Sequence, residues 1–170
     1  MSIGFRRTVC GAVIAIAAVL GAGCGGDDTT SATPALPADV QALRNSMDAF
    51  TSLNLAKAAG YSAAITDCMS NGDVGAMGVH FGNTSLFDGA VDPLHPEVLI
   101  YEPGVDGDMA LVGVEFVVPY TAVPKTGTPP ELFGQKFSQN DVFQLWGLHV
   151  WTHRSNPNGL FAPWNPRVHC

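Results

Sequence analysis

The sequence predicts an α+β fold: an N-terminal helix packed on a small antiparallel sheet, with long ordered loops and one disulfide. Three observations lead to this prediction. An apolar stripe of helical period lies near the start of the domain. Later segments are rich in β-branched and aromatic residues, as strands are. The stretches between them are crowded with Gly and Pro, which favour turns and loops.

Residues 1–23 are typical of a secretory signal peptide. Arg6 and Arg7 precede an apolar run over 12–20, and small residues follow it. The run is shorter than the roughly 20 residues that a membrane-spanning helix needs. We therefore expect an exported protein, located at the outer face of the cell membrane or in the periplasm.

Cys24 follows the small residues of VLGAG, and this junction resembles the bacterial lipoprotein signal. In that signal the Cys is lipidated and becomes the mature N-terminus. The junction departs from the pattern at Gly21, which stands where Leu is usual. Lipidation of Cys24 would anchor the protein to the membrane, and ordinary cleavage after Ala22 or Gly23 is the alternative.

Residues 24–37 are predicted to form a flexible tether, because they are rich in Gly, Ser, Thr, Ala and Pro. A single globular domain is predicted over 38–170, which is long enough to bury a real core. The net charge is −7. We predict no nucleic-acid partner, since phosphate contacts need Lys and Arg. The lipid anchor is the expected membrane contact, and the oligomeric state is left open.

Cys68 and Cys170 are predicted to form a disulfide. Of the four Cys, Cys10 lies in the leader and Cys24 at its end, which leaves one pair in the domain. An oxidising compartment favours the bonding of such a pair. The loop would hold about 100 residues, for which loop-closure entropy gives roughly 4 to 5 kcal/mol. Two separate thiols, or two ligands of one metal, are the alternatives.

The first element is predicted to be a helix over 37–60. Pro37 suits its first turn and Gly60 its end. Four apolar residues form a stripe at steps of three and four: Val40, Leu43, Met47 and Phe50. Residues 61–68 are expected to add a short helix or turn, and 71–89 a loop with a short strand at 77–81.

The segments 97–103 and 109–120 are predicted to pair as an antiparallel hairpin around the turn sequence PGVDGD. Both faces of the second strand are mostly apolar, so we expect it to be central and covered on both sides. One face is expected to hold Val112, Val114, Phe116 and Val118. The other is expected to hold Leu111, Gly113, Glu115 and Val117.

A long loop is predicted over 121–141, and a further strand over 142–153. Turns are predicted for the tail, 156–170. A period of two divides the strand between two faces. One of them is expected to hold Leu145, Gly147, His149, Trp151 and His153.

Three histidines, His80, His149 and His153, are candidate metal ligands, with Glu102 and Glu115 as acidic partners. Imidazole suits a transition metal such as Zn or Cu. On a strand His149 and His153 would lie about 13 Å apart, too far for one ion, so His80 would have to reach His149 from a distant segment. Histidines that hydrogen-bond in a core or lie at the surface are the commoner alternative.

Glu115 is a carboxylate inside an apolar strand. A buried unpaired carboxylate costs several kcal/mol, so it needs a partner or a raised pKa. The residue is therefore a candidate ligand or general base. The alternative is that Glu115 lies on a partly solvent-exposed face of the sheet, or forms an ion pair with Arg154 or Arg167. The same choice applies to Glu102, and no catalytic residue is assigned.

Five blocks follow one another between residues 61 and 170: MGVHFGN, DPLHPEVLIYEP, LVGVEFVV, PELFGQKF and LHVWTHRSNPNGLFAPWNPRVHC. Together they resemble a family of uncharacterised bacterial exported proteins, lipoproteins among them. The resemblance implies that the recurring polar positions are His80, Glu102, Glu115, His149 and the two Cys of the domain. It implies no activity and no substrate.

We therefore expect a lipid-anchored domain of the cell envelope that binds a small ligand or a metal ion. His80, His149 and Glu115 would form the polar floor of its site. Two other functions stay open. One is a small metal-dependent or acid/base enzyme that uses the same residues, and the other is a structural envelope protein without a small-molecule site.

Overall fold

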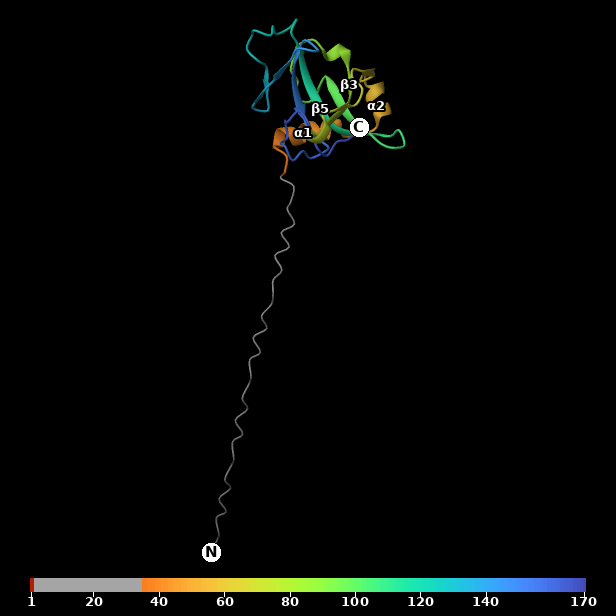
Figure 1. Cartoon of the computed structure of the whole chain (residues 1–170). Helices are drawn as coiled ribbons and strands as arrows, with labels where there is room; N and C mark the ends of the chain where they lie inside the picture. The colour runs from red at the N-terminus through yellow and green to blue at the C-terminus, as the bar shows by residue number, and fades with distance from the viewer. Residues whose placement is uncertain (2–34) are drawn as a thin grey trace. The chain divides into compact units, whose positions relative to one another are not determined.

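The computed structural model describes residue 1 and residues 35–170. The described chain combines helical segments at its start with a mostly antiparallel sheet, so the α+β class is confirmed (Figure 1). The signal peptide, Cys24 and most of the tether lie outside the described residues and stay predictions. Within the described part of the chain, no helix is long and apolar enough to cross a membrane.

The predicted helix over 37–60 is divided into three pieces: α1 (Ala38–Met47), the 3-10 helix η1 (Asp48–Thr51) and α2 (Leu53–Ala58). The prediction of one continuous helix was therefore wrong. The break lies at Ser52, whose backbone is extended (φ −89°, ψ 110°). Beside it, the hydroxyl of Thr51 donates to the carbonyl of Asp48, a local bond of the kind that competes with helix continuation.

The main sheet has seven strands, and every pair in it is antiparallel. The strands are β1 (Ala63–Ala64), β2 (Met69–Ser70), β3 (Ala76–Gly82), β4 (Val98–Pro103), β5 (Met109–Pro119), β8 (Ser138–Asn140) and β9 (Leu145–Val150). Their order is β1-β3-β4-β5-β9-β8, and β2 also pairs with β3. A separate hairpin joins β6 (Glu131–Leu132) to β7 (Gln135–Lys136).

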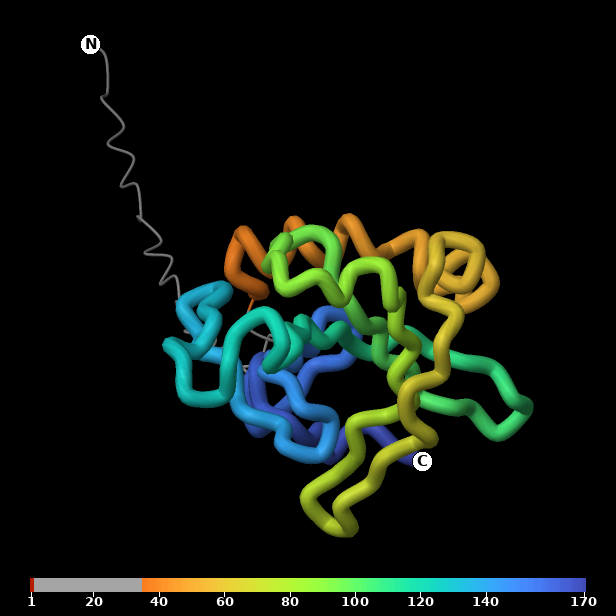
Figure 2. The backbone as a smooth tube through the Cα atoms, turned by 90° about the horizontal axis from the view of Figure 1, so that it is seen from above, coloured from red at the N-terminus to blue at the C-terminus, as the bar shows by residue number. Residues whose placement is uncertain are grey.

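The predicted hairpin is confirmed as β4 and β5, and its turn projects from the rest of the chain (Figure 2). β5 lies between β4 and β9, so it is central as expected. Its predicted faces were wrong at one end. Tyr101 pairs with Leu111 but Ile100 pairs with Gly113, so Val112 is an extra, bulged residue. The bulge places Leu111 on the face of Val114 and moves Val112 to the opposite one.

Three short segments differ from the prediction. Residues 61–68, expected to form a short helix or turn, contain strand β1, and the strand expected at 77–81 is longer, over 76–82. The loop expected over 121–141 contains three short strands. Elements of two or three residues carry too little periodicity to be recognised in a sequence.

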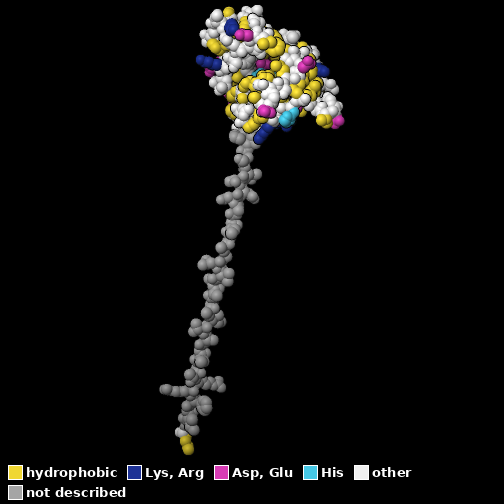
Figure 3. Space-filling model, viewed as in Figure 1, with side chains coloured by type: hydrophobic (Ala, Val, Ile, Leu, Met, Phe, Trp, Pro, Cys, Tyr) yellow, Lys and Arg dark blue, Asp and Glu magenta, His cyan; other side chains and the backbone are white. Residues whose placement is uncertain are grey.

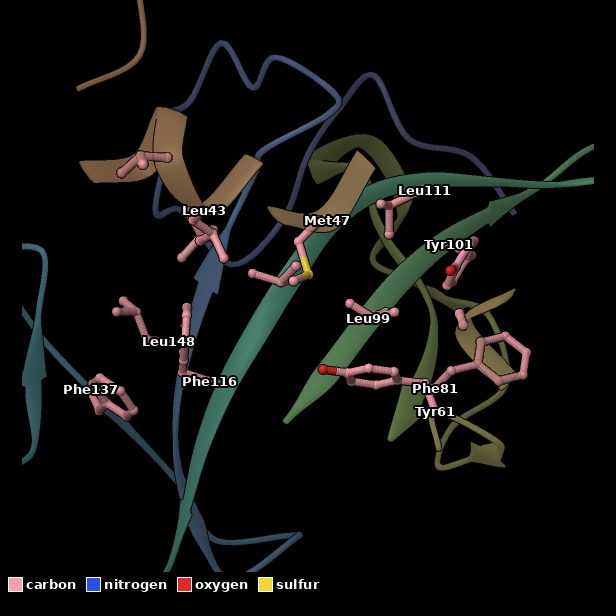
Figure 4. Close-up of a cluster of buried hydrophobic side chains, with 14 of the residues drawn as sticks. Leu43, Met47, Tyr61, Phe81, Leu99, Tyr101, Leu111, Phe116, Phe137 and Leu148 are labelled. Carbon is pink, nitrogen blue, oxygen red and sulfur yellow. The ribbon is translucent and has the colours of Figure 1, made fainter. Parts of the chain in front are cut away.

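Two clusters of buried apolar side chains lie on opposite faces of the sheet. The larger one joins side chains of α1, among them Leu43 and Met47, to strand residues such as Phe116 and Leu148 (Figure 4). The smaller one contains Ala76, Ile100, Val112, Trp151 and Val168. Since side chains alternate along a strand, Leu99 and Ile100 belong to different clusters. The face with the smaller cluster is called the site face below.

The disulfide between Cys68 and Cys170 is confirmed. The two sulfurs lie 2.10 Å apart, and the two Cα atoms 5.6 Å apart. The bond joins the segment just before β2 to the end of the tail. A bridge between Ala76 and Asn165 holds the tail against β3 as well. The tail is therefore held beside β2 and β3.

Candidate functional site

His80, Glu115 and His149 meet on the site face of the sheet. His80 of β3 pairs with Ile100 of β4. Glu115 of β5 pairs with Val98 on one side and with His149 of β9 on the other. Paired residues of neighbouring strands point to the same face, and so do residues two apart in one strand. The register therefore gathers three polar side chains from three strands.

The three side chains present one ligand atom each, and these atoms all lie within 4.8 Å of one another. The Nε2 atoms of His80 and His149 are 3.4 Å apart. Glu115 Oε2 lies 3.7 Å from His80 Nε2, and Glu115 Oε1 lies 3.9 Å from His149 Nδ1. The carboxylate of Glu115 therefore lies beside both rings at distances longer than direct hydrogen bonds, facing Nε2 of His80 and Nδ1 of His149.

Burial controls the protonation of the site. His80 is 4% exposed, and the side chain of His149 is 11% exposed. Loss of solvent lowers the pKa of His80 to about 4 and that of His149 to about 4, and Glu115 opposes the shift of His80. Burial raises the pKa of Glu115, and His80 opposes that shift. Both imidazoles are therefore neutral at neutral pH, which is the form that binds metals.

Thr66 orients one of the imidazoles. Its Oγ1 lies 2.9 Å from Nδ1 of His80. When Nδ1 carries the ring proton, it donates that proton to the hydroxyl of Thr66. Nε2 then has a free lone pair, and this lone pair points toward His149 and Glu115. An outer hydrogen bond of this kind fixes the tautomer of histidines that ligate metals. Two imidazoles and a carboxylate with free positions also form the donor set of several transition-metal centres.

A pocket of about 80 Å³ lies against the three groups. Its other polar lining residues are Thr66 and Asn140. Its apolar lining residues are Ile65, Met69, Met77, Phe87, Val98, Val117, Phe143 and Leu145. Phe143 is 42% exposed, so it lies at the mouth of the pocket. A bound ion would therefore have free positions toward a largely apolar pocket.

Glu102, the fourth predicted site residue, is not part of this group. Arg154 forms an ion pair with its Oε2, and the backbone N–H of His169 donates to its Oε1 at 2.9 Å. Glu102 therefore ties the tail to β4. The arginine partners considered for Glu115 lie elsewhere, since Arg154 binds Glu102 and Arg167 donates to Ser155.

His153 is also outside the group. β9 ends at Val150, so the alternation that would place His153 on the site face stops before it. Nε2 of His153 lies 3.3 Å from Oδ1 of Asp48, beyond the end of α1. The prediction that His149 and His153 do not share one metal ion fits this arrangement.

Glu97 is a buried acid that the sequence reasoning missed. It is 2% exposed, and its Oε2 accepts a hydrogen bond of 2.9 Å from the N–H of Val117. Burial above all raises its pKa to about 7, and the charge of Glu115 adds to the shift. The signal for it was an acid directly before the apolar run VLIY. Thr66, Met69 and Met77 gave no such signal.

Charged side chains are scattered among hydrophobic ones on the face of the molecule seen in Figure 3.

Comparisons with protein-family models, with curated proteins and with solved structures found no match to this chain.

Proposed function

We propose that this domain binds a transition-metal ion through His80, His149 and Glu115. One observation carries the proposal: three ligand atoms from three different strands converge within 4.8 Å in a buried place. Nitrogen and carboxylate ligands of this kind suit Zn, Cu, Ni and Fe. Burial keeps both imidazoles neutral, so protons compete little with a metal ion for the two ring nitrogens at neutral pH.

The pairing of the histidines supports a metal site over a purely structural role. A structural core histidine is usually satisfied by a backbone carbonyl or another fixed partner, and His80 has such partners in Thr66 and the backbone of Gly78, so the support for a metal comes from its pairing with His149. Here Nε2 of His80 faces Nε2 of His149, and at least one of these two nitrogens has no proton to donate. A cation between the rings would satisfy both nitrogens and the carboxylate together.

We also propose that the domain is exported and held at the cell envelope by a lipid on Cys24. The disulfide supports an oxidising compartment. In this proposal α1 packs on the sheet face opposite the site, which the shared cluster of Leu43, Met47 and Phe116 supports. α1 would then not cover the pocket, and the ion would exchange through the pocket mouth beside Phe143.

Metal titration tests the proposed site. We expect purified, metal-depleted protein to bind one equivalent of Zn²⁺ or Co²⁺ and to melt at a higher temperature with the ion present, because the ion binds only the folded state. The double variant His80→Ala/His149→Ala is expected to lose at least 100-fold in affinity. His95→Ala is the matched control, since His95 is exposed and pairs with Asp92. Wild-type protein that binds neither ion would refute the proposal.

The lipid anchor is tested by the mass of the N-terminal peptide from protein expressed in a bacterial host. A diacylglycerol adduct on Cys24 is expected, and Cys24→Ser should abolish it and release the protein from the membrane fraction. A wild-type peptide that begins at Cys24 without the adduct would contradict the anchor but not the metal site.

A further inference from the structure

Two methionines line the same pocket as the three ligands: Met69 of β2 and Met77 of β3. Both are only half-buried. By contrast, Met47 is 2% exposed within the large core cluster, and Met109 packs against that cluster. The two pocket methionines are therefore placed differently from Met47 and Met109, which belong to or contact the large core cluster.

Strand register directs Met69 toward the site face. Met69 pairs with Gly78 of β3, and paired residues point to the same face of a sheet. Gly78 is two residues from His80, so both positions belong to that face. The side chain of Met69 therefore lies diagonally next to that of His80, with no side chain from Gly78 between them.

A bulge brings Met77 to the same face. Met69 pairs with Gly78 while Ser70 pairs with Ala76, so Met77 is an extra residue in β3. Strict alternation would place Met77 with Val79 and Phe81, which contact the large core cluster. The bulge instead directs Met77 into the pocket, and bulges that redirect a side chain occur often beside functional sites.

We propose that the ion bound here is copper(I), with the thioethers of Met69 and Met77 as ligands beside His80 and His149. The inference rests on the metal site proposed above and names its ion. Thioether sulfur is a soft ligand that selects Cu(I), whereas carboxylate and imidazole alone suit Zn²⁺. Glu115 stays available to balance the positive charge of the ion.

The methionine ligands give the two ions different requirements. In the proposed site Cu(I) is bound by both sulfurs and both imidazoles, so loss of the sulfurs strongly weakens Cu(I) binding. Zn²⁺ uses His80, His149 and Glu115, so the same loss changes its affinity little. Leu in place of Met keeps nearly the same volume and apolar character, so the pocket and the fold are retained while the sulfur is removed.

The experiment compares wild type with the double variant Met69→Leu/Met77→Leu. Cu(I) affinity is measured by competition with bicinchoninate under nitrogen. Ascorbate keeps copper reduced and leaves the Cys68–Cys170 disulfide intact. We expect Cu(I) affinity to fall at least 30-fold in the double variant and Zn²⁺ affinity to change less than 3-fold. The control Met47→Leu/Met109→Leu removes two sulfurs outside the pocket and is expected to leave Cu(I) affinity unchanged.

X-ray absorption of the copper-loaded protein supplies a direct readout. We expect sulfur neighbours around copper in wild type and none in the double variant. Cu(I) affinity that is equal in both proteins, or a wild-type copper spectrum without sulfur, would overturn the copper inference. If Zn²⁺ still binds in that case, the metal site itself stands. If wild type binds neither ion, the proposed function fails together with this inference.

Discussion

Glu97 shows how a single buried carboxyl group can make stability depend on pH. Its Oε2 accepts from the N–H of Val117, and its backbone carbonyl accepts from the N–H of Asn83. The hydrogen bond to Val117 favours the charged carboxylate, but the loss of solvent outweighs it, and the pKa rises to about 7 from 4.5. The folded state therefore keeps a proton on Glu97 at pH values where the unfolded chain has lost it.

We predict that Glu97 loses its contribution to the free energy of unfolding as pH rises. Below pH 4.5 both states are protonated and the contribution is complete. Between 4.5 and 7 only the folded state holds the proton, so the contribution falls until the folded state also ionises. The free energy of unfolding of Glu97→Gln, measured relative to wild type, should therefore rise by about 2 to 3 kcal/mol between pH 5 and pH 8.

Urea unfolding of both proteins at the two pH values measures this change. The exposed Glu131 supplies a control, because Glu131→Gln should follow wild type at both pH values. A difference between wild type and Glu97→Gln that is the same at pH 5 and pH 8 would show that Glu97 does not titrate as described.

Strand periodicity predicted part of the site, and bulges account for much of what it missed. Alternation along 142–153 and 109–120 correctly gave the faces of His149 and Glu115. It could not predict that His80 pairs with Ile100, because pairing between strands depends on turns and contacts that a single sequence does not display. It also failed at Val112, where one extra residue reverses the faces.

Helix periodicity had a similar limit. The apolar stripe of Val40, Leu43 and Met47 was correctly predicted, since all three lie on one helix and are buried in the core. The break at Ser52 was missed, because the extended backbone there interrupts the helix without disturbing the apolar pattern. Phe50 still contacts the core cluster from the 3-10 turn.

The strand β9 carries a glycine that makes room for Glu115. Gly147 pairs with Val117, two residues from Glu115 on the neighbouring strand. A Cβ atom at position 147 would lie 2.6 Å from Oε1 of Glu115, closer than any normal contact. The backbone of Gly147 is not in the left-handed region, so alanine fits the strand and disturbs only the carboxylate.

We predict that Gly147→Ala weakens metal binding about tenfold, which corresponds to about 1.4 kcal/mol. The added methyl group displaces the carboxylate from its place between the two histidines while every ligand is retained. Zn²⁺ titration measures the affinity, and circular dichroism at the same temperature confirms that the strand content is unchanged. An affinity equal to that of wild type would mean that Glu115 does not contact the ion.

At the scale of the whole molecule, the disulfide joins segments that the site needs. Cys68 and Cys170 are 102 residues apart in the sequence. Thr66, which orients His80, and Met69, which lines the pocket, flank Cys68. The tail is also held by the bond from His169 to Glu102 and by the bridge at Asn165. The segment 65–70 is therefore fixed from the tail as well as from β3.

We predict that Cys68→Ser/Cys170→Ser lowers both stability and metal affinity. Opening a loop of this length removes a constraint on the unfolded chain worth roughly 4 to 5 kcal/mol in the loop-entropy account. Urea unfolding measures this loss. In addition, the freed segment 65–70 should hold Thr66 less firmly against His80, so Zn²⁺ affinity should fall by about tenfold, the lower end of the effect of losing an outer hydrogen bond.

The two losses can be separated, because Thr66→Val removes the outer hydrogen bond while the disulfide stays closed. If the disulfide acts on the site through Thr66, Thr66→Val should weaken Zn²⁺ binding by a similar factor in wild type and have little further effect in the double serine variant. Effects of the two changes that simply add would show that the disulfide stabilises the fold without positioning His80.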